Sequence, residues 1–202
     1  VTVNAVNDAP VTSEINATTD EDVPIDITLI GSDVDGDNLT YSVVSNTNNA
    51  TIVIDGSVAN YTPPENSYGN LLFTYKANDG ELDSNVSTVN INVAFVNDPP
   101  IAKDMTVNTT EDGGNTGTHI QIKLDATDSD SSTISYAIVD DVSNGTLTFV
   151  NDESVRYVPN QDYNGTDTFT FQANDGNSNS NIATVTINIK SVNDAPVTQN
   201  VS

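Results

Sequence analysis

Acidic residues in three short motifs could bind a metal ion, and every motif occurs twice in the chain. Aspartate and glutamate carboxylates, together with asparagine amides, supply the oxygen ligands that Ca²⁺ takes in proteins. The copies are Asp33-Val34-Asp35 and Asp128-Ser129-Asp130, Glu21-Asp22 and Glu111-Asp112, and Asn78-Asp79-Gly80 and Asn174-Asp175-Gly176. The repetition predicts that the same chemistry is built more than once.

A second recurring stretch marks where one domain ends and the next begins. The pattern Val-Asn-Asp-x-Pro occurs at residues 6–10, 96–100 and 192–196. The later two copies follow runs in which apolar and polar residues alternate, as in a strand, and proline prevents the strand from continuing. We interpret each copy as a domain junction.

The spacing of the junctions predicts two complete tandem repeats, at residues 6–97 and 98–193, while residues 194–202 begin a third. Each repeat has about the length of a whole β-sandwich domain. The chain therefore reads as a string of domains and not as a solenoid of small repeats. We expect it to be part of a longer array.

Short alternating runs rich in Val, Ile and Thr, broken by Asn, Asp and Gly, predict an all-β fold. Seven strands per repeat favour two tandem immunoglobulin- or cadherin-like Greek-key β-sandwiches joined end to end. In the first repeat we expect strands at residues 11–18, 23–30, 39–45, 50–54, 57–61, 71–77 and 86–95. The expected core is Ile27, Leu29, Leu39, Tyr41, Phe73, Tyr75, Val89 and Ile91, with the equivalents Ile122, Leu124, Ile134, Tyr136, Phe169, Phe171, Val185 and Ile187.

Alternating strand directions sort the acidic motifs to the two ends of each sandwich. One set is expected at the junction between the repeats: Glu21, Asp22, Glu65, Asn97, Asp98, Asp128, Asp130 and Asp175. Two incomplete sets await neighbouring repeats: Asn7, Asp8, Asp33, Asp35 and Asp79 on the N-terminal side, and Glu111, Asp112, Asp162, Asn193 and Asp194 on the C-terminal side.

Clustered carboxylates repel one another, by about 1 kcal/mol for two charges 4 Å apart in bulk water and by more where they are desolvated. A cation would remove this repulsion, and Ca²⁺ suits the site because it accepts roughly six to eight oxygen ligands. Zn²⁺ is disfavoured because the chain has no Cys and a single His, His119. Mg²⁺ usually keeps more of its water. We expect one or two ions at the junction; plain turn chemistry is the alternative for the Asp-x-Asp pairs.

The net charge of −24 argues against nucleic acid and against an anionic membrane surface as partners. No apolar run approaches the roughly 18 residues of a membrane span. Without cysteine, disulfides cannot stabilise these domains outside a cell, so another clamp would be useful. We expect no enzyme, because no nucleophile-base grouping or phosphate-binding loop is present. A solvated acidic coat is the alternative to cation sites.

The combined motifs resemble the cadherin repeat, and more closely the bacterial cadherin-like repeats of long secreted surface proteins and adhesins. The resemblance implies Ca²⁺ held between successive domains, with Glu21, Asp98, Asp128, Asp130 and Asp175 as ligands and Asn97 contributing through its carbonyl. Two features depart from the cadherin pattern. Pro99 follows Asp98 where cadherins have a further asparagine, and Glu65 and Asp162 are approximate stand-ins for an Asp-Arg-Glu triplet.

We therefore predict a secreted, extracellular structural extender of a bacterial cell-surface adhesin, made rigid by Ca²⁺ between neighbouring repeats of the same chain. The alternative is an adhesive module that recognises a glycan, a protein or an identical domain on another cell. Its weakness is that the few aromatic residues fall mostly at core positions. A passive linker, whose acids only maintain solubility, is the third reading.

Overall fold

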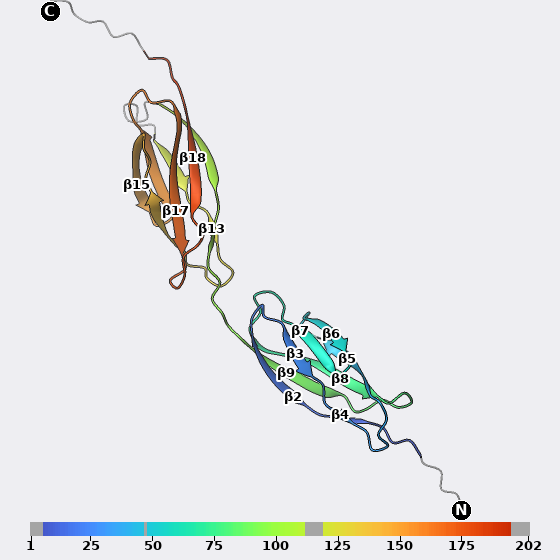
Figure 1. Ribbon diagram of the computed structural model, residues 1–202. Coiled ribbons are helices and arrows are strands. Elements are labelled where there is room, and N and C mark those ends of the chain that lie inside the picture. Colours follow the sequence, from blue (N-terminus) through green and yellow to red (C-terminus); the bar gives the residue numbers. More distant parts are fainter. Residues whose placement is uncertain (1–5, 47, 112–118, 195–202) are drawn as a thin grey trace, which may run out of the picture. The chain divides into compact units, whose positions relative to one another are not determined.

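The computed structural model describes residues 6–46, 48–111 and 119–194 (Figure 1). The chain divides into two compact units, Val1–Val96 and Asn97–Ser202. Every regular element within the described residues is a β-strand, which confirms the all-β prediction. Those residues contain no helix long and apolar enough to span a membrane.

The first unit is a sandwich of a four-stranded and a three-stranded sheet. The strand order is β2-β9-β8-β5 in the larger sheet and β3-β7-β6 in the smaller, and β1 and β4 form a separate short pair. The strands are β1 Val11–Thr12, β2 Ile15–Asp20, β3 Ile25–Thr28, β4 Gly31–Ser32, β5 Thr40–Asn46, β6 Thr51–Asp55, β7 Val58–Thr62, β8 Gly69–Asn78 and β9 Ser87–Ala94.

The second unit repeats this topology, with the orders β11-β18-β17-β14 and β12-β16-β15 and the short pair β10-β13. The strands are β10 Ile101–Ala102, β11 Met105–Thr110, β12 Ile120–Lys123, β13 Ala126–Thr127, β14 Ser135–Asp140, β15 Gly145–Asn151, β16 Ser154–Pro159, β17 Gly165–Asn174 and β18 Ala183–Lys190.

The first predicted strand of each unit is divided between two partners, which the alternation did not predict. β1 pairs antiparallel with β4, whereas β2 pairs parallel with β9. At the division, Asn85 Oδ1 accepts the Thr12 amide (2.9 Å) and Asn85 Nδ2 donates to the Thr12 carbonyl (3.1 Å). A side-chain amide thus takes the place of a neighbouring strand backbone. Asn181 binds Ala102 in the same way in the second unit.

The parallel pairing of β2 with β9 fixes the place of the first acidic turn. Both strands end at the same edge of the sheet, and the Glu21 amide donates to the Ala94 carbonyl (2.9 Å). In the second unit β11 pairs parallel with β18, and the Glu111 amide donates to the Lys190 carbonyl (3.0 Å). Each glutamate therefore lies beside the segment by which the chain leaves its unit.

The core of each unit lies between its two sheets, and most of the predicted inward positions are buried. Four of the predicted core residues are only half-buried: Leu39, Tyr41, Ile134 and Tyr136. They lie on or next to β5 and β14, which are the edge strands of the larger sheets. Two tyrosines that are not among the predicted core residues, Tyr61 and Tyr157, are fully buried. Burial raises the pKa of both hydroxyls.

A buried carboxylate distinguishes the second core from the first. Asp167 on β17 is 4% exposed and has the strand position that Leu71 has on β8. Its oxygens accept the amides of Ser143 (3.1 Å) and Asn144 (2.9 Å) and the hydroxyl of Tyr157 (2.9 Å). Asp167 therefore anchors the loop between β14 and β15 to the core.

We expect Asp167→Leu, which copies the first unit, to destabilise the second unit by about 1–3 kcal/mol, because the buried Tyr157 hydroxyl and two part-buried amides lose an acceptor. Urea denaturation followed by amide NMR signals of the second unit measures this loss. Asp152→Ala, at an exposed position of the same unit, is the control and should change stability by less than about 0.5 kcal/mol. Equal effects of the two substitutions would contradict the anchoring role.

Candidate functional site

The N-terminal end of the first unit, where the chain enters it, brings together the five residues predicted there. Asn7 Nδ2 donates to Asp79 Oδ2 (2.9 Å), and the Asp8 amide donates to Asp35 Oδ2 (2.8 Å). Asp33 Oδ1 accepts the Asp35 amide (2.9 Å). The incoming segment, the β4–β5 loop and the β8–β9 loop thus meet at one end of the sandwich.

The N-terminal end of the second unit has the same arrangement. Asn97 Nδ2 donates to Asp175 Oδ2 (2.8 Å), and the Asp98 amide donates to Asp130 Oδ2 (2.6 Å). Asp128 Oδ1 accepts the Asp130 amide (2.8 Å). Five residues expected in one set therefore lie together within this unit.

The first aspartate of each Asp-x-Asp pair uses its two oxygens differently. Oδ1 of Asp33 and of Asp128 accepts amides of its own loop, which is ordinary turn chemistry for aspartate. Oδ2 of each is buried and has no hydrogen-bond partner. Native structures rarely leave such an atom unsatisfied, so each one needs an explanation such as an ion.

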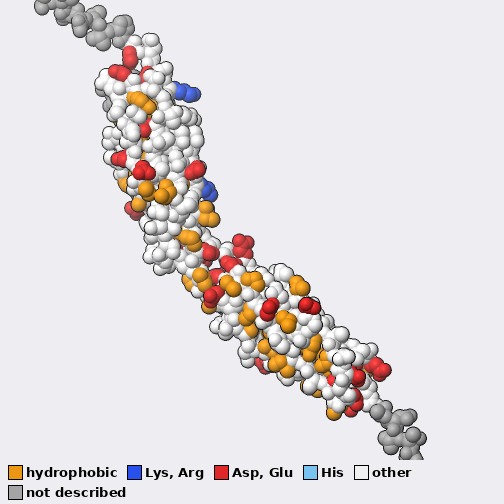
Figure 2. All heavy atoms as spheres, in the orientation of Figure 1, with side chains coloured by type: hydrophobic (Ala, Val, Ile, Leu, Met, Phe, Trp, Pro, Cys, Tyr) orange, Lys and Arg blue, Asp and Glu red, His pale blue; other side chains and the backbone are white. Residues whose placement is uncertain are grey.

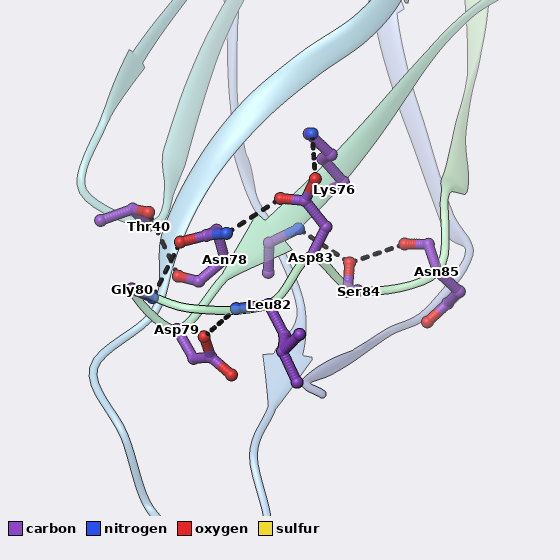
Figure 3. A network of polar contacts seen from close by, with 10 residues as sticks. Thr40, Lys76, Asn78, Asp79, Gly80, Leu82, Asp83, Ser84 and Asn85 are labelled. Carbon is purple, nitrogen blue, oxygen red and sulfur yellow. Dashed lines mark hydrogen bonds and ion pairs between the residues drawn. The ribbon is translucent and has the colours of Figure 1, made fainter. Parts of the chain in front are cut away.

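Figure 3 shows how the β8–β9 loop holds its aspartate at this end. Asp79 Oδ1 accepts the amides of Leu82 and Glu81 (both 2.7 Å), and Oδ2 is held by Asn7. The hydrogen bond from the Leu82 amide lowers the pKa of Asp79 most. The hydrogen bonds from the Glu81 amide and from the Asn7 side chain lower it further. These hydrogen bonds therefore favour the charged form of the carboxylate.

The C-terminal end of the first unit, where the chain leaves it, buries a carboxylate. Glu21 is 3% exposed; its Oε1 accepts the Val96 amide, while its Oε2 is buried without a partner. Asp22 has a left-handed backbone (φ 58°), and its Oδ1 accepts the Asn66 amide (3.0 Å). Glu65 precedes Asn66 in the β7–β8 loop and is exposed.

The C-terminal end of the second unit buries the equivalent glutamate, Glu111, but gives both of its oxygens a hydrogen-bond partner. Glu111 is 6% exposed, and its Oε1 accepts the Val192 amide (2.7 Å). Its Oε2 accepts a hydrogen bond from Asn164 Nδ2 (3.1 Å). Both oxygens of Glu111 are therefore satisfied inside the unit.

Asp162 has the left-handed backbone (φ 58°) that Asn66 has in the first unit (φ 54°). It is thus the counterpart of Asn66, and it does not take the place of Glu65. The remaining predicted residues of this end are Asp112, which lies outside the described residues, and Asn193 and Asp194, which follow Val192. Asn193 Nδ2 donates to the Asp194 carbonyl (3.2 Å), as Asn97 Nδ2 does to that of Asp98.

Three of the predicted ligands, Glu21, Asp33 and Asp128, offer a buried carboxylate oxygen without a partner. This donor set fits a hard cation that takes oxygen ligands. Lys and Arg are few on the face shown in Figure 2. Across residues 6–46, 48–111 and 119–194, no three His, Cys, Asp or Glu side chains are already gathered to hold an ion. The fit therefore rests on the unpartnered oxygens.

Two polar residues at the N-terminal end of the second unit escaped the sequence reasoning. Ser129 Oγ donates to Asp98 Oδ2 (3.0 Å), and Asn177 Nδ2 donates to Asn97 Oδ1 (2.9 Å). Their places inside the acidic loops, between Asp128 and Asp130 and two residues after Asp175, were the available signal.

A sequence profile described as the bacterial Ig domain matches the chain twice, over residues 7–92 and 97–188. EC1-2 of human protocadherin-24 (form II) is 18% identical with a TM-score of 0.56, and the match covers 92% of this chain and 100% of that one. EC1-2 of human mucin-like protocadherin is 16% identical with a TM-score of 0.50, over 91% and 98%. These matches confirm the predicted Ig- or cadherin-like repeats.

The comparison with solved structures also finds a longer protein. The endo-fucoidan hydrolase MfFcnA4 from glycoside hydrolase family 107 is 18% identical, with a TM-score of 0.40. The match covers 91% of this chain, which spans 29% of the length of that enzyme. No curated protein matches the chain.

The Ser178 amide, then Asn97, lowers the pKa of Asp175 from an ordinary 3.8. A lowered pKa gives stability that is present above the unfolded value and lost as the pH falls through the folded one. Asn97→Ala should raise the pKa of Asp175, because a hydrogen bond to the charged form is lost. Carboxyl ¹³C NMR titration measures the change. Asp79 in the other unit is the internal control, and an unmoved Asp175 titration would contradict the assignment.

Proposed function

The chain belongs to the bacterial Ig-domain family, and from that premise we propose that it is a structural extender of an extracellular bacterial surface adhesin. Its repeats are made rigid by Ca²⁺ bound where one repeat meets the next. The module acts mechanically and is not an enzyme, and its partners are the neighbouring repeats of the same chain.

The observation that carries this proposal is the buried carboxylate of Glu21. A carboxylate taken out of water is costly unless it is paired, hydrogen-bonded or bound to a metal. Oε1 of Glu21 uses the Val96 amide, but the buried Oε2 has no hydrogen-bond partner. A bound cation would supply the missing compensation.

Chain connectivity supports placing ligands from both units at one junction. The Val96 amide is bonded to Glu21, and the Asp98 amide is bonded to Asp130. One residue separates Val96 from Asp98, so their Cα atoms are at most about 7.6 Å apart. We assign to this junction Glu21, Asp22, Glu65, Asn97, Asp98, Asp128, Asp130 and Asp175.

The remaining sets are assigned to junctions with a preceding and a following repeat. They are Asn7, Asp8, Asp33, Asp35 and Asp79, and Glu111, Asp112, Asp162, Asn193 and Asp194. Asp162 corresponds to Asn66 and not to Glu65, so Glu65 and Asp162 do not occupy equivalent loop positions. These two residues are therefore the weakest of all the assigned ligands.

The mechanism is linkage between ion binding and the assembled junction. An ion that binds the assembled form alone stabilises it by about 2.7 kcal/mol at 100 times Kd. Extracellular modules bind Ca²⁺ with a Kd of about 10⁻⁴ to 10⁻³ M, so the sites would fill outside the cell. In a chain without cysteine, the ion takes the stabilising part that disulfides have in many secreted domains.

Adhesive recognition is the second candidate function, and one observation favours it. A hollow of about 330 Å³ on the second unit is lined by Tyr136, Phe149, Val150 and Asp152, among others. Phe149 is 48% exposed, and an exposed ring can stack on a sugar or an apolar side chain. Binding to a glycan array that Phe149→Ala abolishes and EDTA leaves intact would separate this function from calcium-dependent extension.

Calorimetric titration of the chain should show saturable binding of one or two Ca²⁺ ions at the junction, and EDTA should lower the melting temperature. Replacing Asp128 and Asp130 together by Ala should abolish or strongly weaken binding at the junction. The matched control, Asp141→Ala with Asp152→Ala, removes the same charge from exposed positions of the same unit and should leave binding intact. Equal binding by both double variants would contradict the assignment of Asp128 and Asp130 as ligands, and no binding by the wild type would favour a passive linker.

Rigidity is read separately by small-angle X-ray scattering with and without EDTA. Chelation should shorten the mean particle dimension, because an ion-free junction samples bent arrangements. The Asp128→Ala, Asp130→Ala variant in Ca²⁺ should scatter like the wild type in EDTA. Identical dimensions in Ca²⁺ and EDTA would refute the stiffening mechanism even where Ca²⁺ binds.

A further inference from the structure

The two C-terminal ends satisfy the same buried glutamate in different ways. In both units Oε1 accepts an amide of the outgoing chain, from Val96 or Val192. Oε2 of Glu21 is buried without a hydrogen-bond partner. Oε2 of Glu111 accepts a hydrogen bond from Asn164 Nδ2 at 3.1 Å.

The loops that produce this difference share one backbone conformation. Each has a residue with left-handed backbone, Asn66 or Asp162, three positions before a glycine of positive φ. The Ser67 amide donates to the Pro64 carbonyl in the first loop. The Tyr163 amide donates to the Asn160 carbonyl in the second, and both distances are 3.2 Å. Tyr68 is therefore the counterpart of Asn164, since each immediately precedes the glycine.

Tyr68 does not donate a hydrogen bond to Glu21, whereas Asn164 donates one to Glu111 in the second unit. Its side chain is 60% exposed, and its ring packs edge-on against Phe95, with centroids 5.1 Å apart and 74° between the planes. The Tyr68 ring thus contacts Phe95, and the second oxygen of Glu21 stays without a hydrogen-bond partner.

We infer that Asn164 is a built-in neutral substitute for a cation, so that the C-terminal end of the second unit is stable without Ca²⁺ while that of the first unit depends on it. A hydrogen bond to a charged group compensates part of the cost of burying that charge. The same donor occupies the oxygen that an ion would need, so it weakens ion binding. The residue before the loop glycine thus tunes the calcium dependence of each joint. For the first unit the inference rests on the proposed function; for Asn164 it does not.

The test in the first unit transfers the amide. Tyr68→Asn is compared with Tyr68→Ala, which loses the same ring but gains no donor. Tyr68→Asn should bind Ca²⁺ about tenfold more weakly than Tyr68→Ala, the equilibrium factor of one hydrogen bond to a charge. In EDTA, β2 and β9 should exchange their amide hydrogens more slowly in Tyr68→Asn. Equal affinity and equal exchange in the two variants would overturn the inference.

The test in the second unit removes the amide in EDTA, where no ion can contribute. Asn164→Ala should accelerate hydrogen exchange of β11 and β18 about tenfold. Asn164→Asp should accelerate it further, because a second carboxylate would face Glu111. Wild-type exchange in Asn164→Ala would overturn the substitute role. If the wild type binds no Ca²⁺, the proposed function fails, while this arm still decides the role of Asn164.

Discussion

A carboxylate buried at the C-terminal end of each sandwich is the constraint to which the surrounding structure responds. Because β2 pairs parallel with β9, and β11 with β18, the residue after the first long strand must lie where the chain leaves the unit. A glutamate there accepts the outgoing amide of Val96 or Val192. The strand end and the departing backbone are thereby joined by a bond to a buried charge, and bonds to charged groups are stronger than neutral ones.

At the ends of the sandwiches, the two oxygens of one carboxylate have different surroundings. Oδ1 of Asp33 and Asp128 and Oε1 of Glu21 accept backbone amides. The second oxygen of each is buried and unpartnered. One oxygen thus fixes the local conformation, and the other keeps its capacity for a ligand. A carboxylate held in this way is oriented before any ion arrives, which lowers the ordering cost of binding.

Local signals account for what could be predicted from the sequence, and distant side-chain pairs account for what could not. Period-two alternation and turn residues gave the strands, and strand direction gave the ends at which Asp33 and Glu21 lie. The division of the first strand depends on Asn85, which is far along the chain from Thr12. The mismatch of Glu65 and Asp162 depends on backbone angles that composition does not encode. Such features are visible only once the loops have been brought together.

The two units act as an internal comparison, because one topology is completed with different side chains. Where the first unit has Leu71 and Tyr68, the second has Asp167 and Asn164, and both polar residues are bonded inside the unit. Buried side chains whose hydrogen-bond donors and acceptors are paired with one another need no ion. Each donor must then have its acceptor, since a half-satisfied buried network is costly. In the first unit, by contrast, the buried second oxygen of Glu21 has no hydrogen-bond partner, so the cost of burying it is not compensated by side chains of that unit. The inference that one C-terminal end depends on a cation and the other does not therefore requires no difference of fold between the two units.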